Sequence, residues 1–439
     1  MTRAARIQIL RLAAAALLVV GLGSGRAQAF HSGGVGDCDG CHSMHNSFDG
    51  SAVTGTQSGP FLLKGSDQSS MCLYCHEAAG VPTPRAYFIS TASADLTPGS
   101  APVQLTPGGD FGWLKKTYSW AVSGQVQMSL GERHGHNIVA TDYGYQPDVR
   151  NALAPGGTYP SSALACSSCH DPHGRYRRLA DGSVGTTGLP IFDSGSYAES
   201  TPPRTGVSAV GSYRMLAGIG YQPRSLNGGF AFAFPPPMAI SPSSYNRSES
   251  VTQTRVAYGQ GMSEWCANCH TSMIQGGRTV AMASLLHPAG AAARLGPGIV
   301  SNYDAYVKTG NVSNVDATRA YWSLVPFEEG ANSTYVSLLL HARSDDTFLN
   351  GPDTNSTVSC MTCHRAHASG FDSMTRFRVG NDFITVGNGS TVVWPDPASN
   401  PAQAQGRSAA ETQRSYYDRP ATLYAPYQAQ LCNKCHVKD

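Results

Sequence analysis

The sequence of 439 residues predicts an irregular fold, rich in coil, with short α-helices and little β structure. Charged residues make up 14% of the chain, against about 25% in typical soluble domains, so long helices with charged outer faces are not expected. The chain contains 48 glycines and 27 prolines, and clusters such as Thr106-Pro-Gly-Gly and Pro235-Pro-Pro indicate turns. Few stretches show the apolar period of a long helix or strand.

The balance of charge is close to neutral. Lysine and arginine number 31, and aspartate and glutamate number 29, which gives a formal net charge of +2. A protein that binds nucleic acid normally carries a basic patch or stripe, so no nucleic-acid partner is expected.

Residues 1–29 are predicted to be a secretory signal peptide. Arginines precede an apolar stretch from Leu12 to Leu22, and Ala27-Gln-Ala29 forms a small-x-small cleavage site. A membrane anchor is the alternative, but the apolar stretch is shorter than the ~20 residues of a membrane span. We therefore expect a secreted mature chain, residues 30–439, with no transmembrane segment.

All twelve cysteines fall into six C-x-x-C pairs, and a histidine directly follows each pair. This spacing is the attachment signature of c-type haem. The six motifs are formed by Cys38, Cys41 and His42; Cys72, Cys75 and His76; Cys166, Cys169 and His170; Cys266, Cys269 and His270; Cys360, Cys363 and His364; and Cys432, Cys435 and His436. A disulfide framework does not require the histidines, and zinc sites usually take two such pairs per metal.

The spacing follows from the chemistry of the haem. Two thiols add to the two vinyl groups of one haem and form thioethers, and the next residue brings its imidazole to the iron as the proximal ligand. Six motifs therefore predict six covalently attached haems c. The twelve cysteines are then all used, and none remains for a disulfide.

Eight histidines remain after the six proximal ones, and six irons need six more ligands to become six-coordinate. The eight are His31, His45, His134, His136, His173, His287, His341 and His367. Three of them, His45, His173 and His367, each follow a proximal histidine by three residues. In a helical segment such a histidine lies on the same face as that proximal histidine. It can therefore reach only another haem, which indicates that the haems lie in contact.

We expect the distal ligands to be His45, His136, His173, His287, His341 and His367. His31 and His134 are then the spare histidines, although the sequence offers no decisive reason to prefer His136 to His134. Methionine is the alternative axial ligand, but histidine is present in excess.

The haems are expected to form the core of one unit that spans residues 30–439. Each is an apolar plate larger than a tryptophan side chain, and the thioethers would tie down loops as disulfides do elsewhere. Short helices are expected at the haem motifs and near residues 278–287, 300–308, 315–324, 333–342 and 424–436. The spacing of the motifs reveals no repeat period.

Several segments resemble the OmcS-type hexahaem cytochromes. They are Phe30-His-Ser-Gly-Gly, Cys166-Ser-Ser-Cys-His-Asp-Pro-His-Gly, Met262-Ser-Glu-Trp-Cys-Ala-Asn-Cys-His, Cys363-His-Arg-Ala-His-Ala-Ser-Gly-Phe-Asp and Leu431-Cys-Asn-Lys-Cys-His. The resemblance spans the mature chain and the order of its motifs. It implies an extracellular filament at the cell surface, in which the stacked haems of successive subunits form one wire.

The same resemblance assigns a role to individual histidines. It implies that His45 ligates a haem of the adjacent subunit, the one attached through Cys360, Cys363 and His364. It also implies that His136, His173, His287, His341 and His367 are the other distal ligands. The implied function is long-range electron transfer to external acceptors, such as metal oxides, and to other cytochromes.

Two alternatives belong to different functional classes. One is a monomeric periplasmic electron shuttle, and the other is a multihaem reductase with one open haem. An iron with two histidine ligands has no free position for a substrate, so we expect an electron-transfer protein and not an enzyme. Binding of carbon monoxide to the reduced protein distinguishes the reductase, and electron microscopy distinguishes the filament from the shuttle.

Overall fold

The computed structural model describes the chain in segments that include all six C-x-x-C-H motifs. The described residues are 38–43, 47–48, 51–52, 62–80, 84, 87–173, 177–179, 184–185, 209–210, 216–226, 228–237, 239–242, 244–275, 278–279, 287–306, 317–388 and 391–436. The predicted signal peptide, His31 and His45 lie outside these residues.

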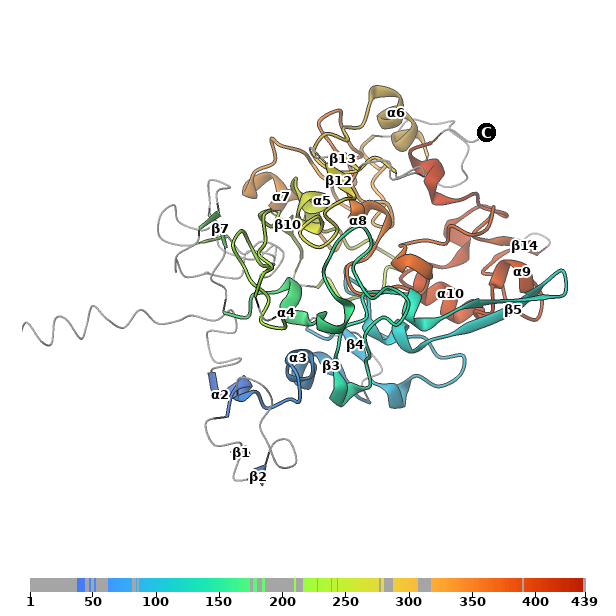
Figure 1. Ribbon diagram of the computed structural model, residues 1–439. Helices are drawn as coiled ribbons and strands as arrows, with labels where there is room; N and C mark the ends of the chain where they lie inside the picture. Colours follow the sequence, from blue (N-terminus) through green and yellow to red (C-terminus); the bar gives the residue numbers. More distant parts are fainter. Residues whose placement is uncertain are drawn as a thin grey trace, which may run out of the picture.

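Regular structure in the described residues consists of short elements separated by coil (Figure 1). The α-helices are α2 (Cys38–Cys41), α3 (Gln68–His76), α4 (Cys166–Cys169), α5 (Met262–Cys266), α6 (Pro297–Ala305), α7 (Tyr335–His341), α8 (Cys360–Cys363), α9 (Pro401–Ala404) and α10 (Ala409–Ser415). The 3-10 helices are η2 (Ser93–Asp95), η3 (Phe111–Lys115), η4 (Gly131–Arg133), η5 (Thr141–Tyr143), η6 (Ser161–Ala163), η7 (Asp372–Met374), η8 (Ala421–Leu423) and η9 (Leu431–Lys434). The predicted coil-rich fold with short helices is confirmed.

The strands are few-residue pieces that pair mostly in twos. They are β1 (Ser47–Phe48), β2 (Ser51–Ala52), β3 (Glu77–Ala78), β4 (Ser90–Thr91), β5 (Tyr118–Val122), β6 (Gln125–Ser129), β7 (Arg177–Leu179), β8 (Val184–Gly185), β9 (Ala209–Val210), β10 (Ala239–Ile240), β11 (Ala257–Tyr258), β12 (Ile274–Gln275), β13 (Arg278–Thr279), β14 (Val386–Asn388) and β15 (Thr391–Val393). The β5–β6 hairpin, in which Val122 pairs with Gln125, projects from the body of the molecule (Figure 1). β3 and β4 form a parallel pair directly after the second motif.

The sequence explains where the longer helices begin. Asp67 caps α3 by accepting a hydrogen bond from Ser70 N–H at 2.8 Å, and Thr334 caps α7 by accepting from Ser337 N–H at 3.1 Å. Pro297 occupies the first turn of α6, where its missing N–H costs no hydrogen bond. The helices predicted near 300–308 and 333–342 are therefore confirmed, with shifted ends.

Three other helix predictions need correction. Residues 317–324 form turns, and the chain reaches Pro326 directly after a turn closed by Val325 N–H on Trp322 O at 2.9 Å. The prediction over 278–287 is wrong at residues 278–279, which form β13, and is untested over residues 280–286, which lie outside the described residues. Within residues 424–436 the only helix is η9. The backbone just before it forms an antiparallel bridge between Ala429 and Phe383 instead of a helix.

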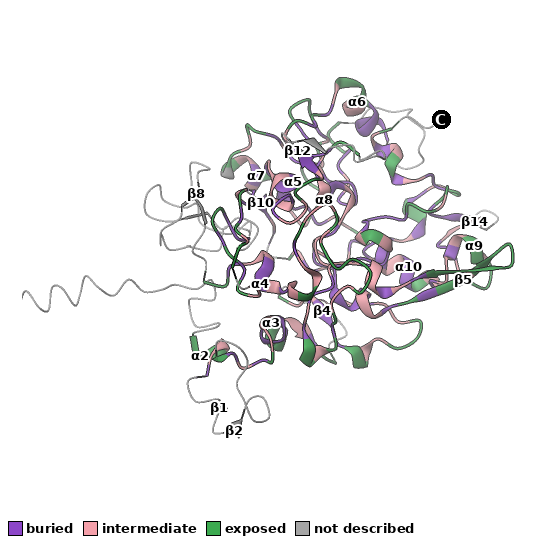
Figure 2. Cartoon of the chain, in the orientation of Figure 1, coloured by how far each residue is buried: buried purple, intermediate pink, exposed green. Residues whose placement is uncertain are grey.

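Apolar packing is concentrated in the C-terminal third of the chain. Trp394 stacks on Tyr416 with ring centroids 4.6 Å apart, and Trp322 stacks on Tyr424 at 5.4 Å. The other clusters are small, and attachment cysteines pack against several of them, including Cys166 and Cys266. Figure 2 shows buried residues distributed among many short segments rather than in one layered core.

A buried carboxyl group makes stability depend on pH. Glu328 is 0% exposed and accepts hydrogen bonds from Met262 N–H at 2.8 Å and from the Thr357 hydroxyl at 3.0 Å. Burial raises the pKa of Glu328 to about 8. The folded chain therefore holds a proton that the unfolded chain releases above pH ~4.3, and this contribution to stability is lost as the pH rises toward 8.

We expect Glu328→Gln to raise the melting temperature at pH 8 by a few degrees, because a neutral amide replaces a buried charge. At pH 5 the gain should be much smaller, since Glu328 is then largely protonated. Thermal unfolding of the haem-loaded protein at both pH values tests this. An equal change at both would show that the titration of Glu328 plays no part.

Candidate haem sites

Each motif folds as a turn that gathers its two cysteines and its histidine on one side. In five motifs the histidine N–H donates to the carbonyl of the first cysteine, four residues earlier, at 2.8–3.0 Å. These five pairs are His42 with Cys38, His170 with Cys166, His270 with Cys266, His364 with Cys360, and His436 with Cys432. Residues i, i+3 and i+4 of a helical turn share a face, so both thiols and the imidazole can address one haem.

The six motifs follow one another in space in the order of the sequence. The side chains of Cys72 and Cys166 lie side by side and influence each other's pKa, which joins the second motif to the third. The side chains of Cys266 and Cys360 do the same and join the fourth motif to the fifth. At the other three junctions a cysteine lies near a cysteine of the next motif: Cys41 near Cys75, Cys169 near Cys269, and Cys363 near Cys432 and Cys435. In each case burial is the main cause that raises the pKa of the first-named cysteine, and its neighbour is the second. The attachment sites are therefore neighbours in the order of the sequence, and Figure 1 labels the helices of the first five motifs, α2, α3, α4, α5 and α8.

The contacts along this row alternate with a period of two motifs. First cysteines meet at the second and fourth junctions, and second cysteines meet at the first and third, whereas at the fifth the second cysteine Cys363 lies near both Cys432 and Cys435. The backbone follows the same rule: Ser69 accepts from Cys166 N–H at 3.1 Å, and Ser263 accepts from Cys360 N–H at 3.0 Å. Both serines stand three residues before a first cysteine. The structure thus contains a repeat of paired motifs that the irregular spacing of the motifs conceals.

Six of the twelve candidate ligands use the ring nitrogen Nδ1 for a hydrogen bond within the protein. The Nδ1 atom donates to a backbone carbonyl in five histidines, which are His76 (Tyr87 O, 2.6 Å), His136 (Ala366 O, 2.6 Å), His270 (Pro155 O, 2.8 Å), His287 (Pro288 O, 2.9 Å) and His364 (Ser373 O, 2.8 Å). In His341 the acceptor is the carboxylate of Glu329, at 2.6 Å. This bond fixes the tautomer that leaves Nε2 available for a metal.

Four proximal histidines face four of the predicted distal histidines. The ring centroids are 6.4 Å apart for His42 and His173, 6.4 Å for His170 and His367, 6.2 Å for His270 and His136, and 5.8 Å for His436 and His287. Two imidazoles that bind one metal ion from opposite sides through bonds of about 2 Å bring their centroids about 6 Å apart. The donor sets at the first, third, fourth and sixth motifs therefore fit a haem iron with two histidine ligands.

The facing pairs obey a simple rule at the odd-numbered motifs. His173 belongs to the third motif and faces the proximal histidine of the first, and His367 belongs to the fifth and faces that of the third. Each of the two lies three residues after its own proximal histidine. A distal ligand at this offset is thus supplied two motifs further along the row.

Glycine-rich turns hold these ligands in place. In Thr106-Pro-Gly-Gly, a Cβ atom on Gly108 would lie 2.9 Å from the His367 ring, and one on Gly109 would lie 1.7 Å from Ala368 O. Gly109 also has a φ of +89°, which side chains rarely tolerate. The ring of Phe111 also stacks on the ring of His367, and the two ring centroids lie 4.7 Å apart. Turns that the sequence indicates only as chain reversals therefore position a candidate haem ligand.

His134 differs from the candidate ligands in using both of its ring nitrogens within the protein. Nδ1 hydrogen-bonds to Trp113 O at 3.0 Å, and Nε2 to the Ser129 hydroxyl at 2.8 Å. The side chain is 0% exposed, and burial lowers its pKa. Burial also lowers the pKa of His136 to about 4, which favours the neutral imidazole that a metal requires. The structure supports His136, and not His134, as the ligand.

We expect His136→Ala to open one of the six haems to carbon monoxide, because the fourth iron loses its distal imidazole. His134→Asn serves as the matched control, since it alters a buried histidine two residues away that faces no proximal ring. Difference spectra of the reduced proteins with carbon monoxide measure the effect. Equal carbon monoxide binding by both variants would contradict the assignment.

The remaining candidate ligands are placed less completely. His341 ends α7. Its pKa is raised, mainly by the hydrogen bond to Glu329. His76 and His364 end the second and fifth motifs, and their distal ligands stay predictions. No sequence pattern indicates Glu329 or Ala366 O as partners of ligating rings, because neither lies at a characteristic offset from its histidine: Ala366 is 230 residues from His136, and Glu329 is 12 residues from His341.

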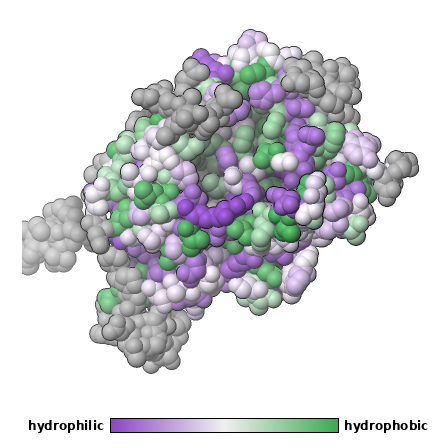
Figure 3. Space-filling view, turned by 45° about the vertical axis from the view of Figure 1, so that its right-hand side comes forward, coloured by the Kyte–Doolittle hydropathy of each residue, from purple (hydrophilic) through white to green (hydrophobic). Residues whose placement is uncertain are grey.

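The face in Figure 3 is hollowed near its centre, with hydrophilic and hydrophobic residues mixed around the hollow. Among the helices of the described residues, none combines the length and the apolar character that a membrane span requires.

Comparison with known proteins identifies the family. No protein-family model matches the chain. The C-type cytochrome OmcS of Geobacter sulfurreducens is 55% identical over 436 residues, which cover 98% of each chain. The chain belongs to the OmcS family.

Solved structures of OmcS share the fold. One is described as cryo-EM of OmcS nanowires and another as an outer membrane cytochrome S filament, both from Geobacter sulfurreducens. Each gives a TM-score of 0.86 at 54% identity and covers 93% of this chain and 100% of the solved chain. The predicted resemblance to OmcS-type cytochromes and the predicted fold class are confirmed.

Proposed function

We propose that this member of the OmcS family is the subunit of an extracellular filament that conducts electrons over long distances through six covalently attached haems. The observation that carries the proposal is the unbroken row of six attachment sites in the order of the sequence. The filaments named for the two OmcS structures support polymerisation. The electrons pass to external acceptors, such as metal oxides, and to other cytochromes.

The residues of the chain have distinct tasks in this function. The twelve motif cysteines attach the haems, and the six motif histidines are the proximal ligands. The distal ligands are His45, His136, His173, His287, His341 and His367. The haem supplies a one-electron iron couple when bound. The protein contributes two neutral imidazoles per iron, holds six of these twelve rings by Nδ1 hydrogen bonds, and so leaves no position for a substrate.

The join between subunits follows from the rule at the odd-numbered motifs. His173 serves the first motif and His367 serves the third, so the fifth motif requires a histidine from a motif two steps beyond it. The chain has no seventh motif, but the first motif of the next subunit takes that place. Its histidine at the same offset is His45, which therefore ligates the haem on Cys360, Cys363 and His364 of the preceding subunit.

The alternation of cysteine contacts supports the same join. After the fifth junction, which uses the second cysteine of the fifth motif, the next junction should use first cysteines. The sixth motif offers Cys432 and the first motif of the next subunit offers Cys38, and both are exposed in the single chain. Continuing the internal pattern across the interface therefore yields a row of haems without a break.

Electron microscopy of the exported, haem-loaded protein tests the proposal. We expect filaments in which one subunit repeats along the axis, and no carbon monoxide binding at any reduced haem. A protein that stays monomeric at high concentration would support the periplasmic shuttle. Substantial carbon monoxide binding by the unmodified protein would support the reductase with an open haem.

A further inference from the structure

Lys434 lies inside the sixth motif and is entirely buried. Its side chain is 0% exposed, and Nζ donates to three carbonyl oxygens, those of Tyr303 at 2.9 Å, Tyr306 at 2.7 Å and Ala320 at 2.6 Å. Three acceptors match the three N–H groups of an ammonium ion. The Nζ atom also lies 4.1 Å from the centroid of the Tyr303 ring, a position that favours a cation.

No carboxylate neutralises this ammonium at short range. Among the described residues, none of the ion pairs within 4.0 Å involves Lys434. Asp304 acts on it only at longer range. Burial lowers the pKa of Lys434 to about 7, but the three carbonyl acceptors favour the ammonium form, because a neutral amine has only two N–H groups to donate. Since Cys432, Cys435 and His436 flank Lys434 in the sequence, this positive charge lies close to the sixth haem site.

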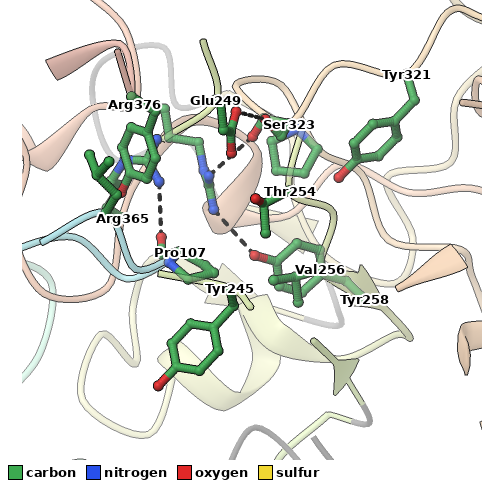
Figure 4. A pocket seen from close by; sticks show the side chains of 13 residues that line it. Pro107, Tyr245, Glu249, Thr254, Val256, Tyr258, Tyr321, Ser323, Arg365 and Arg376 are labelled. Carbon is green, nitrogen blue, oxygen red and sulfur yellow. Dashed lines mark hydrogen bonds between the residues drawn. The ribbon is translucent and has the colours of Figure 1, made fainter. Parts of the chain in front are cut away.

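Arg365 gives the fifth haem site a similar charge. It directly follows the proximal His364, is 3% exposed, donates to Pro107 O at 3.0 Å and stacks on Tyr417 with 3.7 Å between its guanidinium carbon and the ring centroid. Figure 4 shows it at a hollow that also contains Glu249. That carboxylate forms its ion pair with Arg419, so its charge is already balanced.

The third haem site lies beside a buried group of opposite sign. Asp110 is 0% exposed, and its carboxylate accepts hydrogen bonds from the N–H groups of Thr91, Gln104 and Gly112 at 2.7–2.9 Å. The next residue, Phe111, stacks on the His367 ring. No described cation lies within ion-pair distance of Asp110. Burial raises the pKa of Asp110, and the hydrogen bonds from the Thr91 hydroxyl and the backbone N–H groups oppose this rise because they favour the ionised carboxylate.

We propose that these fixed charges set the reduction potentials of the haems, so that the fifth and sixth accept electrons more readily than the third. Reduction adds a negative charge to a haem, and a nearby buried cation stabilises that charge while a buried anion opposes it. In a partly reduced subunit, electrons therefore collect at the C-terminal end of the row. This inference rests on the proposed attachment of six haems.

Potentiometric titration of the filaments, followed by haem absorbance, tests the proposal. In each of the variants Lys434→Met and Arg365→Met, one of the haems that titrate at the high-potential end of the curve should move to a lower reduction potential. We expect about a tenfold change in the reduction equilibrium, which is 59 mV for a one-electron couple. Lys434→Arg and Arg365→Lys retain the charge and serve as matched controls.

Asp110→Asn provides a test of the opposite sign, since it removes an anion and should shift the low-potential end of the curve upward. The mass of each variant must correspond to six haems. A mass below six haems would refute the attachment itself. Six haems with potentials that no charge-removing variant moves would overturn only the proposed control by charge, as would equal shifts in the charge-retaining controls.

Discussion

The His45→Ala variant is expected to be secreted with six haems and to form no filaments. His173 and His367 each face the proximal histidine of a motif two steps back, and the proposed extension of this rule makes the fifth haem dependent on His45 of the next subunit. An iron–nitrogen bond across the interface is far stronger than the polar contacts of an ordinary protein interface, so its loss should remove assembly rather than weaken it slightly. Negative-stain electron microscopy and intact mass measure the two halves of this expectation.

The control for this variant is Asn46→Ala, which alters the neighbouring position without removing an imidazole. It should polymerise normally. A second readout strengthens the test: the fifth haem of the His45→Ala monomer should bind carbon monoxide when reduced, and free imidazole should compete for that position. Normal filaments from His45→Ala would contradict the role given to His45 at the interface.

A chain made without haem attachment is expected not to fold. Regular elements in the described residues are short, most apolar clusters are small, and several of them pack against the attachment cysteines. The entropy of ordering such long coil segments is about 1–2 kcal/mol per residue, and no protein-only packing of this size can offset it. As in proteins that fold only with their metal, attachment of the haem is coupled to folding.

Expression in cells that lack the haem-attachment machinery gives the protein for this test. We expect no cooperative thermal transition and rapid digestion by protease, whereas the haem-loaded chain should resist both. Haem-loaded chain treated in parallel controls for the protease. A cooperative transition in the haem-free chain would contradict the idea that the haems complete the core.

The local parts of the sites could be predicted from the sequence, and the long-range parts could not. Two thiols and an imidazole at i, i+3 and i+4 are fixed by one turn of chain, so the proximal ligands follow from spacing alone. The offset of three residues identified His173 and His367 as ligands for other haems. It could not say which haems, because that depends on how the motifs follow one another in space.

Other features depend on contacts between distant segments. His136 is held by Ala366 O, 230 residues further along the chain, so only the structure separates it from His134. The repeat of paired motifs is carried by contacts such as Ser263 with Cys360, and loops of unequal length hide it from any search for a period. The helix predicted over 315–324 failed because its aromatic residues pack in turns around the C-terminal cluster.

The central claim is that all twelve thiols of the chain are thioethers to six haems. Intact-mass spectrometry of the purified, denatured protein tests it most directly, because thioether links survive denaturation whereas axial ligands do not. The result we predict is the mass of the mature polypeptide plus six haems, with no thiol available for alkylation. A mass equal to that of the bare polypeptide, or twelve alkylated cysteines, would contradict it.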